Sequence, residues 1–558
     1  MKKIIQFIRF TNILSKTTPD TVYINGDIIT MNPQMPSANA VAVKNGKITA
    51  VGSNEKIKQI TGKKTKVIDL NGKTLIPGFI EPHSHLAMYG SVLTGVDCYP
   101  RSNKNMDEIL EKISAAAKKT PKSKWITGWG YDDTMTENSR HLTKEDLDKA
   151  APDHNVFISH ISGHIAYVNS KLLSLAGIDK DTPDPEGGEY GRFENGEPNG
   201  LIAETPAMMK FYNLMPQPSV REILKGLILA GRDYTAQGIT TANDGGFMGI
   251  APLVAYRKAQ KSGKFHIRIY ANLFAMMLEF FEKKNITLKK LGVISGSGDE
   301  WLKIGAAKLI QDGSIQGFTA ALKQPYHTKP DYKGYLTMSQ EEINKTVLKY
   351  HKAGFQVQIH GNGDAAIESN IKAIENALKV FPRKDHRHQI IHCQTASDEQ
   401  LDKMAELGIS ANFFPVHIHY WGDRHYKLFL GPERAERIDP LKSAEERGIL
   451  FSMHSDCPVT PVSPLMSIYA AVNRKTSSGR VLGSSQRISV QKALEALTVN
   501  SAKMIFEEHS RGSIEPGKLA DFAVLSENPL SVKPEKIKDI IVEKTIVDGK
   551  IIYTARGN

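Results

Sequence analysis

Hydrophobic and polar positions alternate in short blocks near both ends of the chain. Residues 21–72 and the two segments 519–525 and 540–553 show the period of two that is typical of half-buried strands. Asn-Gly and Asp-Gly pairs, which favour tight hairpin turns, separate these blocks at 25–26, 45–46, 71–72 and 548–549. Neither end has enough strands for a core of its own, so we expect both ends to form one small β-sandwich.

The central part of the chain alternates short apolar runs with stretches of helical periodicity, such as 220–237 and 339–353. Alternation of strands and helices indicates a parallel sheet, and eight such units predict an α/β protein with a closed (β/α)8 TIM barrel. The eight predicted barrel strands are 75–82, 239–244, 267–274, 303–309, 355–360, 388–392, 409–414 and 450–455.

The first two predicted barrel strands are too far apart for a single crossover. Residues from about 97 to 215 are therefore interpreted as an insertion after the first barrel strand, and as the source of a lid over the pocket. The predicted organisation is a sandwich part over 1–76, the barrel over 77–506 and the second sandwich part over 507–558.

Composition narrows the class of protein. A chain of 558 residues with 40% hydrophobic and 24% charged residues can bury a large core. The net charge of +12 comes from dispersed lysines without interleaved aromatic residues, so we expect no nucleic-acid partner. Three cysteines make no disulfide framework and fit a reducing compartment.

The first 16 residues do not form a convincing signal peptide, because polar residues interrupt the apolar run and no small-residue cleavage site follows. No window has the apolar length needed to span a bilayer. We therefore expect a cytoplasmic protein without a membrane partner, and a homodimer is compatible with the sequence.

Six side chains that can bind metal ions stand at the ends of predicted barrel strands. TIM-barrel enzymes place their chemistry at the carboxyl ends of these strands, so the repeated pattern predicts a metal-dependent hydrolase. In His83-Ser84-His85 the two imidazoles lie on the same side of an extended chain and can chelate one ion. The six candidate ligands are His83, His85, Lys308, His360, His392 and Asp456.

Lys308 falls in a strand that should be buried on both sides, where an amine is costly unless it pairs or is modified. One interpretation is an ion pair with Asp312 or another carboxylate. The other, favoured by the histidines at four further positions, is carboxylation by carbon dioxide, with the new oxygens bridging two metal ions. Asp456 would take the proton of a water that a metal has acidified.

Taken together, these residues resemble the amidohydrolase superfamily, and in particular the branch of N-substituted formamide deformylase and the YtcJ-like and AepA-like proteins. The resemblance covers nearly the whole chain, from Ile-Pro-Gly-Phe-Ile-Glu-Pro-His-Ser-His at 76–85 to the last motif at 512–525. The other matching stretches are 162–170, 238–246, 308–314, 359–366 and 454–459.

The resemblance implies a barrel with a composite sandwich and two divalent metal ions, usually zinc. Carried over by position, His83, His85 and Asp456 bind the more buried ion, His360 and His392 bind the outer one, and carboxylated Lys308 bridges them. Two residues depart from the pattern: Glu81 replaces the aspartate of many relatives, and His454 adds an imidazole near the proposed base.

The insertion and the region after the seventh strand supply candidates for substrate binding. Ser162-Gly163-His164 resembles the family's Ser-Gly-His, and His164 is the second candidate catalytic residue because its imidazole can polarise a substrate carbonyl. The other candidates are Trp129, Tyr131, His417, His419, Tyr420 and Trp421.

The leading hypothesis is hydrolysis of a carbon–nitrogen bond in a small linear amide or N-formyl compound. A metal-bound hydroxide would attack the carbonyl, with Asp456 as general base. One alternative is a deaminase of a cyclic or amidine-like substrate. Another is a catalytically silent regulatory protein on the same fold, which the complete set of ligands disfavours.

Overall fold

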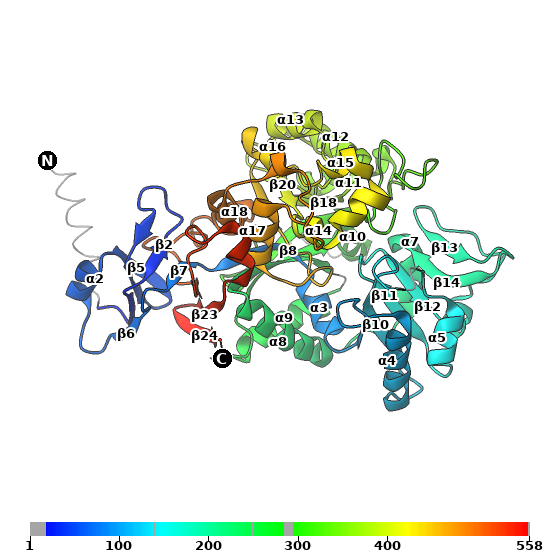
Figure 1. Ribbon diagram of the computed structural model, residues 1–558, viewed down its shortest axis with the longest axis horizontal. Helices are drawn as coiled ribbons and strands as arrows, with labels where there is room; N and C mark the ends of the chain where they lie inside the picture. Colours follow the sequence, from blue (N-terminus) through cyan, green and yellow to red (C-terminus); the bar gives the residue numbers. More distant parts are fainter. Residues whose placement is uncertain (1–17, 138–139, 248, 284–293, 556–558) are drawn as a thin grey trace.

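The computed structural model describes residues 18–137, 140–247, 249–283 and 294–555. Three parts follow one another along the longest axis: a β-sandwich, a barrel and a separate lobe (Figure 1). The segment 1–16, predicted not to be a signal peptide, lies outside the described residues. No helix within the described ranges is both long and apolar enough to cross a membrane.

The central part is an eight-stranded sheet in the order β21-β20-β19-β18-β17-β16-β15-β8, in which every paired neighbour is parallel. Its strands are β8 (Phe79–Ser84), β15 (Ile239–Phe247), β16 (Arg268–Phe274), β17 (Leu302–Ile310), β18 (Val357–Gly361), β19 (Gln389–His392), β20 (Ser410–Phe413) and β21 (Phe451–Met453). Two backbone hydrogen bonds join the segment after β21 to the end of β8, the first strand of the sheet to the last. Asp456 N donates to His83 O over 3.2 Å, and His85 N donates to Cys457 O over 2.7 Å. The predicted TIM barrel is confirmed.

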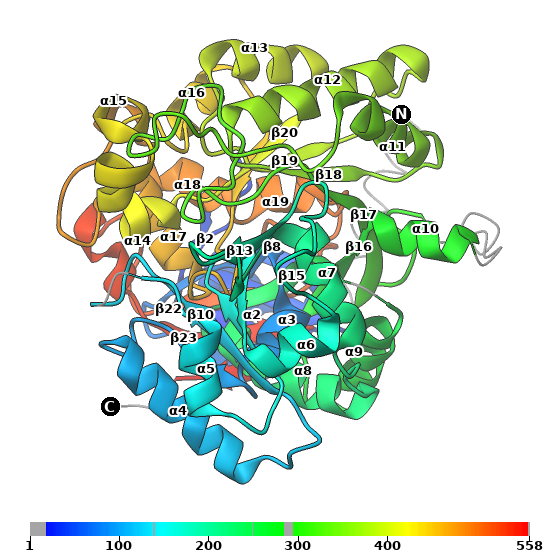
Figure 2. The ribbon, with the colours of Figure 1, turned by 90° about the vertical axis from the view of Figure 1, so that its right-hand side faces the viewer.

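Helices surround the barrel strands (Figure 2). The apolar faces of most of them share one core with the outer side of the sheet, because both faces of a parallel sheet must be covered. These helices are α3 (Leu86–Val92), α8 (Val220–Ala236), α9 (Ala251–Lys261), α10 (Ala275–Lys283), α11 (Gln340–Lys352), α12 (Asp364–Val380), α13 (Asp398–Leu407), α14 (Val416–Arg424), α15 (Gly431–Ala435), α16 (Leu441–Glu446), α17 (Pro464–Asn473), α18 (Val490–Ala496) and α19 (Val499–Met504), with a π-helical turn η1 (His425–Phe429) and 3-10 turns η2 (Ser484–Gln486) and η3 (Pro534–Asp539). Of these, α14, α15 and η1 pack instead in two smaller clusters.

The prediction of a single barrel strand over residues 75–82 is wrong. The structure divides it at Gly78 into β7 (Thr74–Pro77), which belongs to the sandwich, and β8 of the barrel. A Cβ atom on Gly78 would lie 2.3 Å from the Thr240 side chain, so only glycine permits this close passage from one sheet to the other.

The sandwich combines both ends of the chain. Strand β22 pairs antiparallel with β7 and β23, and both sheets contribute side chains to a single core. One sheet has the order β5-β4-β1-β6 and the other β24-β23-β22-β7-β2-β3. Their elements are β1 (Thr21–Ile24), β2 (Asp27–Ile29), β3 (Ser37–Ala38), β4 (Ala40–Lys44), β5 (Lys47–Gly52), α2 (Asn54–Ile60), β6 (Lys66–Asp69), β22 (Phe522–Leu525), β23 (Val542–Val547) and β24 (Lys550–Thr554).

The insertion forms a six-stranded mixed sheet in the order β13-β14-β12-β11-β10-β9. It lies at the end of the barrel opposite the sandwich (Figure 1). Trp421 Nε1 on α14 donates to Asp132 Oδ2 over 3.0 Å, which links the lobe to the barrel. Its elements are β9 (Val96–Asp97), α4 (Met106–Lys119), β10 (Ile126–Tyr131), α5 (Lys144–Ala150), β11 (Val156–His160), β12 (Ile165–Val168), α6 (Ser170–Ala176), β13 (Glu189–Arg192), β14 (Pro198–Ala203) and α7 (Glu204–Leu214).

Two buried histidines away from the pocket make stability depend on pH. Val357 N donates to His388 Nδ1 (3.0 Å), His388 Nε2 lies 2.9 Å from His351 Nδ1, and His351 Nε2 lies 2.7 Å from Phe381 O. This series of hydrogen bonds can form completely only when both imidazole rings are neutral. Burial, more than any other cause, lowers the pKa of both imidazoles.

We expect acid to destabilise the protein through this pair. Below a pH of about 6.5 the unfolded chain binds protons that the folded pair does not, so the free energy of unfolding falls by about 1.4 kcal/mol per pH unit for each histidine. Urea unfolding between pH 8 and 5 measures this slope. His388→Gln should flatten it, whereas His509→Gln, at an exposed residue, should not. An unchanged slope in His388→Gln would contradict the assignment.

Candidate metal centre and pocket

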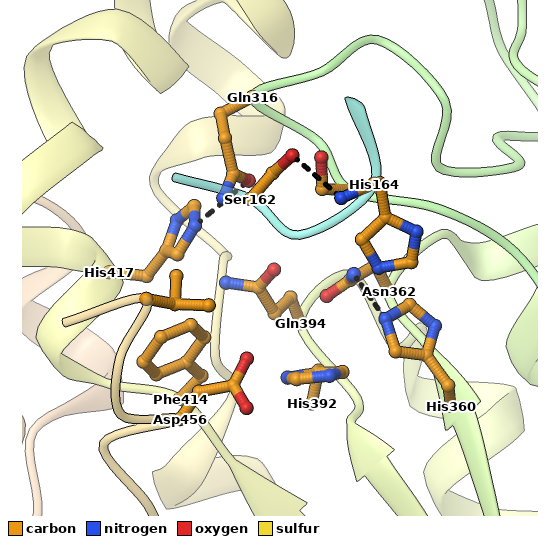
Figure 3. Close-up of a pocket in the computed structure, with 12 residues that line it drawn as sticks. Ser162, His164, Gln316, His360, Asn362, His392, Gln394, Phe414, His417 and Asp456 are labelled. Atoms are coloured by element: carbon orange, nitrogen blue, oxygen red, sulfur yellow. Dashed lines mark hydrogen bonds between the residues drawn. The ribbon is translucent and has the colours of Figure 1, made fainter. Parts of the chain in front are cut away.

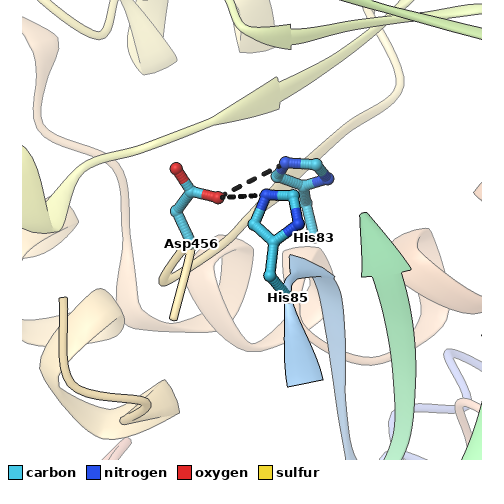
Figure 4. Close-up of side chains that lie close together, drawn as sticks. All are labelled: His83, His85 and Asp456. Carbon is cyan, nitrogen blue, oxygen red and sulfur yellow. Dashed lines mark ion pairs between the residues drawn. The ribbon is translucent and has the colours of Figure 1, made fainter. Parts of the chain in front are cut away.

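The end of β8 and the loop after β21 bring two imidazoles and a carboxylate together. Asp456 Oδ1 lies 3.4 Å from His83 Nε2 and 3.5 Å from His85 Nε2 (Figure 4). The potential ligand atoms of the three residues all lie within 4.8 Å of one another. A Cβ on Gly245 would be 2.5 Å from His83 Cε1, so this site requires a glycine on neighbouring strand β15.

His360 and His392, at the ends of β18 and β19, extend the cluster. Their ring centroids are 4.4 Å apart, and the ring of His392 lies 5.6 Å from that of His83. Asp312 Oδ1 is 2.9 Å from His360 Nδ1, which orients the imidazole. The same carboxylate accepts backbone N–H bonds from Asn362, Gly363 and Ala321, so the Asp312 side chain is firmly held.

The amine of Lys308 on β17 is buried and makes no hydrogen bond with any residue in the described part of the chain. Asp312, considered from sequence as its ion-pair partner, binds His360 instead. Burial lowers the pKa of Lys308 below that of a free amine and raises the pKa of Asp456 above that of a free carboxyl group. An uncharged amine in this position is a nucleophile able to combine with carbon dioxide.

The histidines of the cluster are neutral. Burial, more than any other cause, lowers the pKa of His83 far below its usual value, and that of His85 to about 3. Burial has the same effect on His360 and His392. A neutral imidazole with a free lone pair is the form that binds metal ions.

Glu81 and His454, the two departures from the family pattern, lie beneath the cluster. Glu81 accepts hydrogen bonds from Ser455 N (3.1 Å) and Ser455 Oγ (3.0 Å), so it holds the loop that carries Asp456. Burial raises the pKa of Glu81 to about 8. His454 stacks on Phe414 with ring centroids 4.6 Å apart, and burial lowers the pKa of its imidazole. Both ring nitrogens of His454 are buried without a hydrogen-bond partner among the described residues, and its ring centroid lies 5.2 Å from that of His83 and 4.9 Å from that of His392, so His454 is a further imidazole of the cluster.

The insertion lobe contributes the opposite wall of the pocket. His164 and Ser162, from the loop between β11 and β12, face His360 and His392 across it (Figure 3). Glu204 Oε2, fully buried, lies 2.8 Å from His164 Nδ1. The lining residues are Ser162, His164, Ser314, Gln316, His360, Asn362, His392, Gln394, Phe414, His417, Asp456 and Val459.

The structure places the other predicted substrate residues outside this lining. Tyr131 is buried in the core of the lobe, and its hydroxyl donates to Arg140 O. Trp421 packs behind His417 with ring centroids 4.5 Å apart. Trp129 and Tyr420 pack in the same apolar cluster as Trp421, and His419 Nδ1 lies 3.1 Å from Lys475 O. Of the candidates, only His164 and His417 face the pocket.

Sequence reasoning missed several residues that the fold brings to the pocket. Asp312 orients His360, which is 48 positions away in the chain. Glu204 orients His164, which is 40 positions away. Gln316, Gln394 and Asn362 line the pocket although nothing in their spacing marks them. The one available signal was local: Asp312 stands four positions after Lys308, in the same Lys-Leu-Ile-Gln-Asp-Gly-Ser motif.

The residues present fit divalent metal ions. Lys308 Nζ, Asp456 Oδ1 and His392 Nδ1 are buried without a hydrogen-bond partner among the described residues, and buried polar atoms of this kind need a ligand. Neutral imidazoles and a carboxylate are also the donors that zinc and similar ions prefer. A TIM barrel with such a cluster at the carboxyl ends of its strands defines the class of metal-dependent hydrolases.

Comparison with known proteins supports this class and narrows it. A model of the amidohydrolase family matches residues 66–553, and the chain belongs to this family. It is 32% identical to the putative amidohydrolase YtcJ of Bacillus subtilis, over 95% of this chain and 99% of that protein. It is 27% identical to N-substituted formamide deformylase of Arthrobacter pascens, over 97% and 99% of the two chains.

A solved structure has the same fold. The crystal structure of an uncharacterized metal-dependent hydrolase from Pyrococcus horikoshii superposes with a TM-score of 0.73 at 25% sequence identity, covering 92% of this chain and 99% of that one. The predicted resemblance to the amidohydrolase branch is confirmed.

Proposed function

We propose that the protein hydrolyses the carbon–nitrogen bond of a small linear amide or N-formyl compound. The observation that carries this proposal is a cluster at the carboxyl ends of the barrel strands. It combines four neutral histidines, Asp456 and the amine of Lys308, which has no hydrogen-bond partner among the described residues. Likeness to N-substituted formamide deformylase supports the choice of substrate class.

His83, His85 and Asp456 would hold one divalent ion, for which their nitrogen and oxygen donors suit zinc, and His360 and His392 would hold a second. Carboxylated Lys308 would contribute an oxygen to each. When bound, the ions acidify water and polarise a carbonyl oxygen. The chain itself supplies the burial that keeps the imidazoles neutral and the carboxylate of Asp312 that orients His360.

Asp456 is positioned to accept and then donate a proton during the reaction. Its carboxylate lines the pocket beside His392 (Figure 3). Burial raises its pKa, so it is a stronger base than an exposed aspartate and can take a proton from the attacking water. The same group can then deliver this proton to the leaving nitrogen.

His164 faces the pocket from the lobe, opposite Asp456. Burial lowers its pKa, but the neighbouring carboxylate of Glu204 outweighs this and leaves the pKa raised. The raised pKa favours the imidazolium form of His164, in which Nδ1 donates to Glu204 and Nε2 can donate to the substrate carbonyl, where negative charge develops. Glu204 acts here as a positioning residue for His164.

A product assay tests this function. We expect the zinc-loaded protein to release an amine and an acid in equal amounts from N-substituted formamides or short N-acyl amines, and chelation to abolish the release. Cyclic amides and amidine-like rings serve as the second arm of the panel. Release of ammonia from that arm alone would replace the proposal by the deaminase alternative, and no turnover of either arm would favour a regulatory protein.

A further inference from the structure

A second group of side chains, of the types that serve in nucleophilic catalysis, lies on the lobe side of the pocket. Ser162 Oγ lies 2.8 Å from His160 Nδ1, and His160 Nε2 lies 3.3 Å from Asp133 Oδ1. His160 is fully buried at the end of β11, and Asp133 follows β10 on the neighbouring strand. A nucleophile, a base and a carboxylate that orients the base are thus arranged in series.

The hydrogen bonds determine which nitrogen of His160 carries the proton. Ser162 N donates to His160 Nδ1 over 3.2 Å, so Nδ1 presents a lone pair. The proton of the neutral ring therefore lies on Nε2, beside the Asp133 carboxylate. His164 N donates to Ser162 Oγ over 3.1 Å, which leaves the hydroxyl proton of Ser162 free to point at His160 Nδ1.

The proton on His160 Nε2 argues against a metal ion between Asp132, Asp133 and His160. Oxygen and nitrogen atoms of Asp132, Asp133 and His160 all lie within 4.8 Å of one another, which is close enough for a cation. However, His160 Nε2 has its proton, and both Asp132 oxygens already accept hydrogen bonds, Oδ1 from Thr134 and Oδ2 from Trp421. We therefore interpret Ser162, His160 and Asp133 as a polar series in which a contact of 3.3 Å links His160 Nε2 to the Asp133 carboxylate.

Ser162 is reachable from the pocket and has a suitable donor nearby. It lines the pocket next to Gln316 (Figure 3). His417 Nε2 lies 3.1 Å from Gln316 Oε1, so the Gln316 carbonyl faces His417 and its amide N–H groups remain available as donors. A side-chain amide beside a nucleophile is one of the groups that stabilise the oxyanion in acyl transfer.

We propose that Ser162 is a second nucleophile, activated by His160 and Asp133, that cleaves small carboxylic esters independently of the metal centre. Ser162 Oγ attacks the carbonyl carbon and its proton passes to His160 Nδ1. The bond to the ester oxygen then breaks, and the alcohol leaves with the proton from His160. Water attacks the acyl-serine with His160 again as base, so ester and water give acid and alcohol.

The experiment uses the full chain after removal of metal ions by a chelator. A fluorophosphonate probe should form a bond between phosphorus and Ser162 Oγ with loss of fluoride, and peptide mapping should locate the adduct. 4-Nitrophenyl acetate should give a burst of nitrophenolate together with an acetylated Ser162. Both signals should vanish in Ser162→Ala and slow by about 100-fold in Asp133→Asn.

Matched variants show whether labelling depends on Ser162 and Asp133 in particular. Ser174→Ala removes an exposed hydroxyl on α6 of the same lobe and should keep full labelling. Ser162→Ala and Asp133→Asn leave fully buried His160 in place, and their melting temperatures show whether they are folded. Labelling that is absent from Ser162, or equally fast in Asp133→Asn, overturns the proposal. Because metal-free protein is used, a failed amide assay does not affect the result.

Discussion

Asp456→Asn should reduce kcat for amide hydrolysis by about 1,000-fold or more while the protein stays folded. The amide cannot accept the proton of the attacking water, and it replaces the carboxylate oxygen that lies within 3.5 Å of both His83 and His85. Steady-state kinetics on the best substrate of the panel would measure the loss.

Asp402→Asn provides the matched control, because it makes the same change on the exposed face of α13 and should leave kcat unaltered. Metal analysis of both variants separates a lost base from a lost ligand. If Asp456→Asn turned over substrate at the normal rate with its full metal content, the proton-transfer role assigned to this residue would be wrong.

Lys308→Ala should lose at least one metal ion and nearly all activity. The buried amine has no partner among the described residues, and an unmodified ammonium would repel divalent cations. Carboxylation converts the lysine and carbon dioxide into an anionic carbamate with release of one proton, which gives two oxygens able to bridge two ions. Elemental analysis together with kinetics measures both losses.

Chemical rescue makes the Lys308 test specific. Formate, acetate or propionate should partly restore metal content and activity in Lys308→Ala by filling the space of the missing carboxylate. Lys345→Ala, at an exposed position on α11, should show neither loss nor rescue. Bare lysine with two fully occupied metal sites in an experimental structure would remove Lys308 from the proposed ligand set.

The barrel could be predicted from sequence because its signal is local. Each strand is a short apolar run followed by a polar residue, and each helix has its own periodicity, so eight units can be counted without knowing how they pack. The sandwich was predictable for the same reason: Asn45 and Gly46 both adopt the positive φ that a two-residue hairpin needs. The one strand that was wrong, 75–82, has a continuous apolar pattern across Gly78, where the chain changes sheets.

The aromatic candidates show where local pattern stops being informative. Tyr131 ends strand β10 and Trp421 lies on helix α14; both are buried, and their polar atoms bind Arg140 and Asp132 instead of facing the cavity. A side chain at the end of a strand can point into or away from a pocket, and its neighbours in space decide which.

By itself, the sequence determined the class of fold, the connection of the two chain ends into one sandwich, and six side chains at the ends of barrel strands. Apolar periodicity and strand-end position are properties of neighbouring residues, so they can be read along the chain. Only the tertiary structure decided that Asp312 holds His360, that Glu204 holds His164, and that Lys308 makes no hydrogen bond with any of the described residues. These contacts join residues from different strands and from the lobe, and which atoms meet depends on how those elements pack.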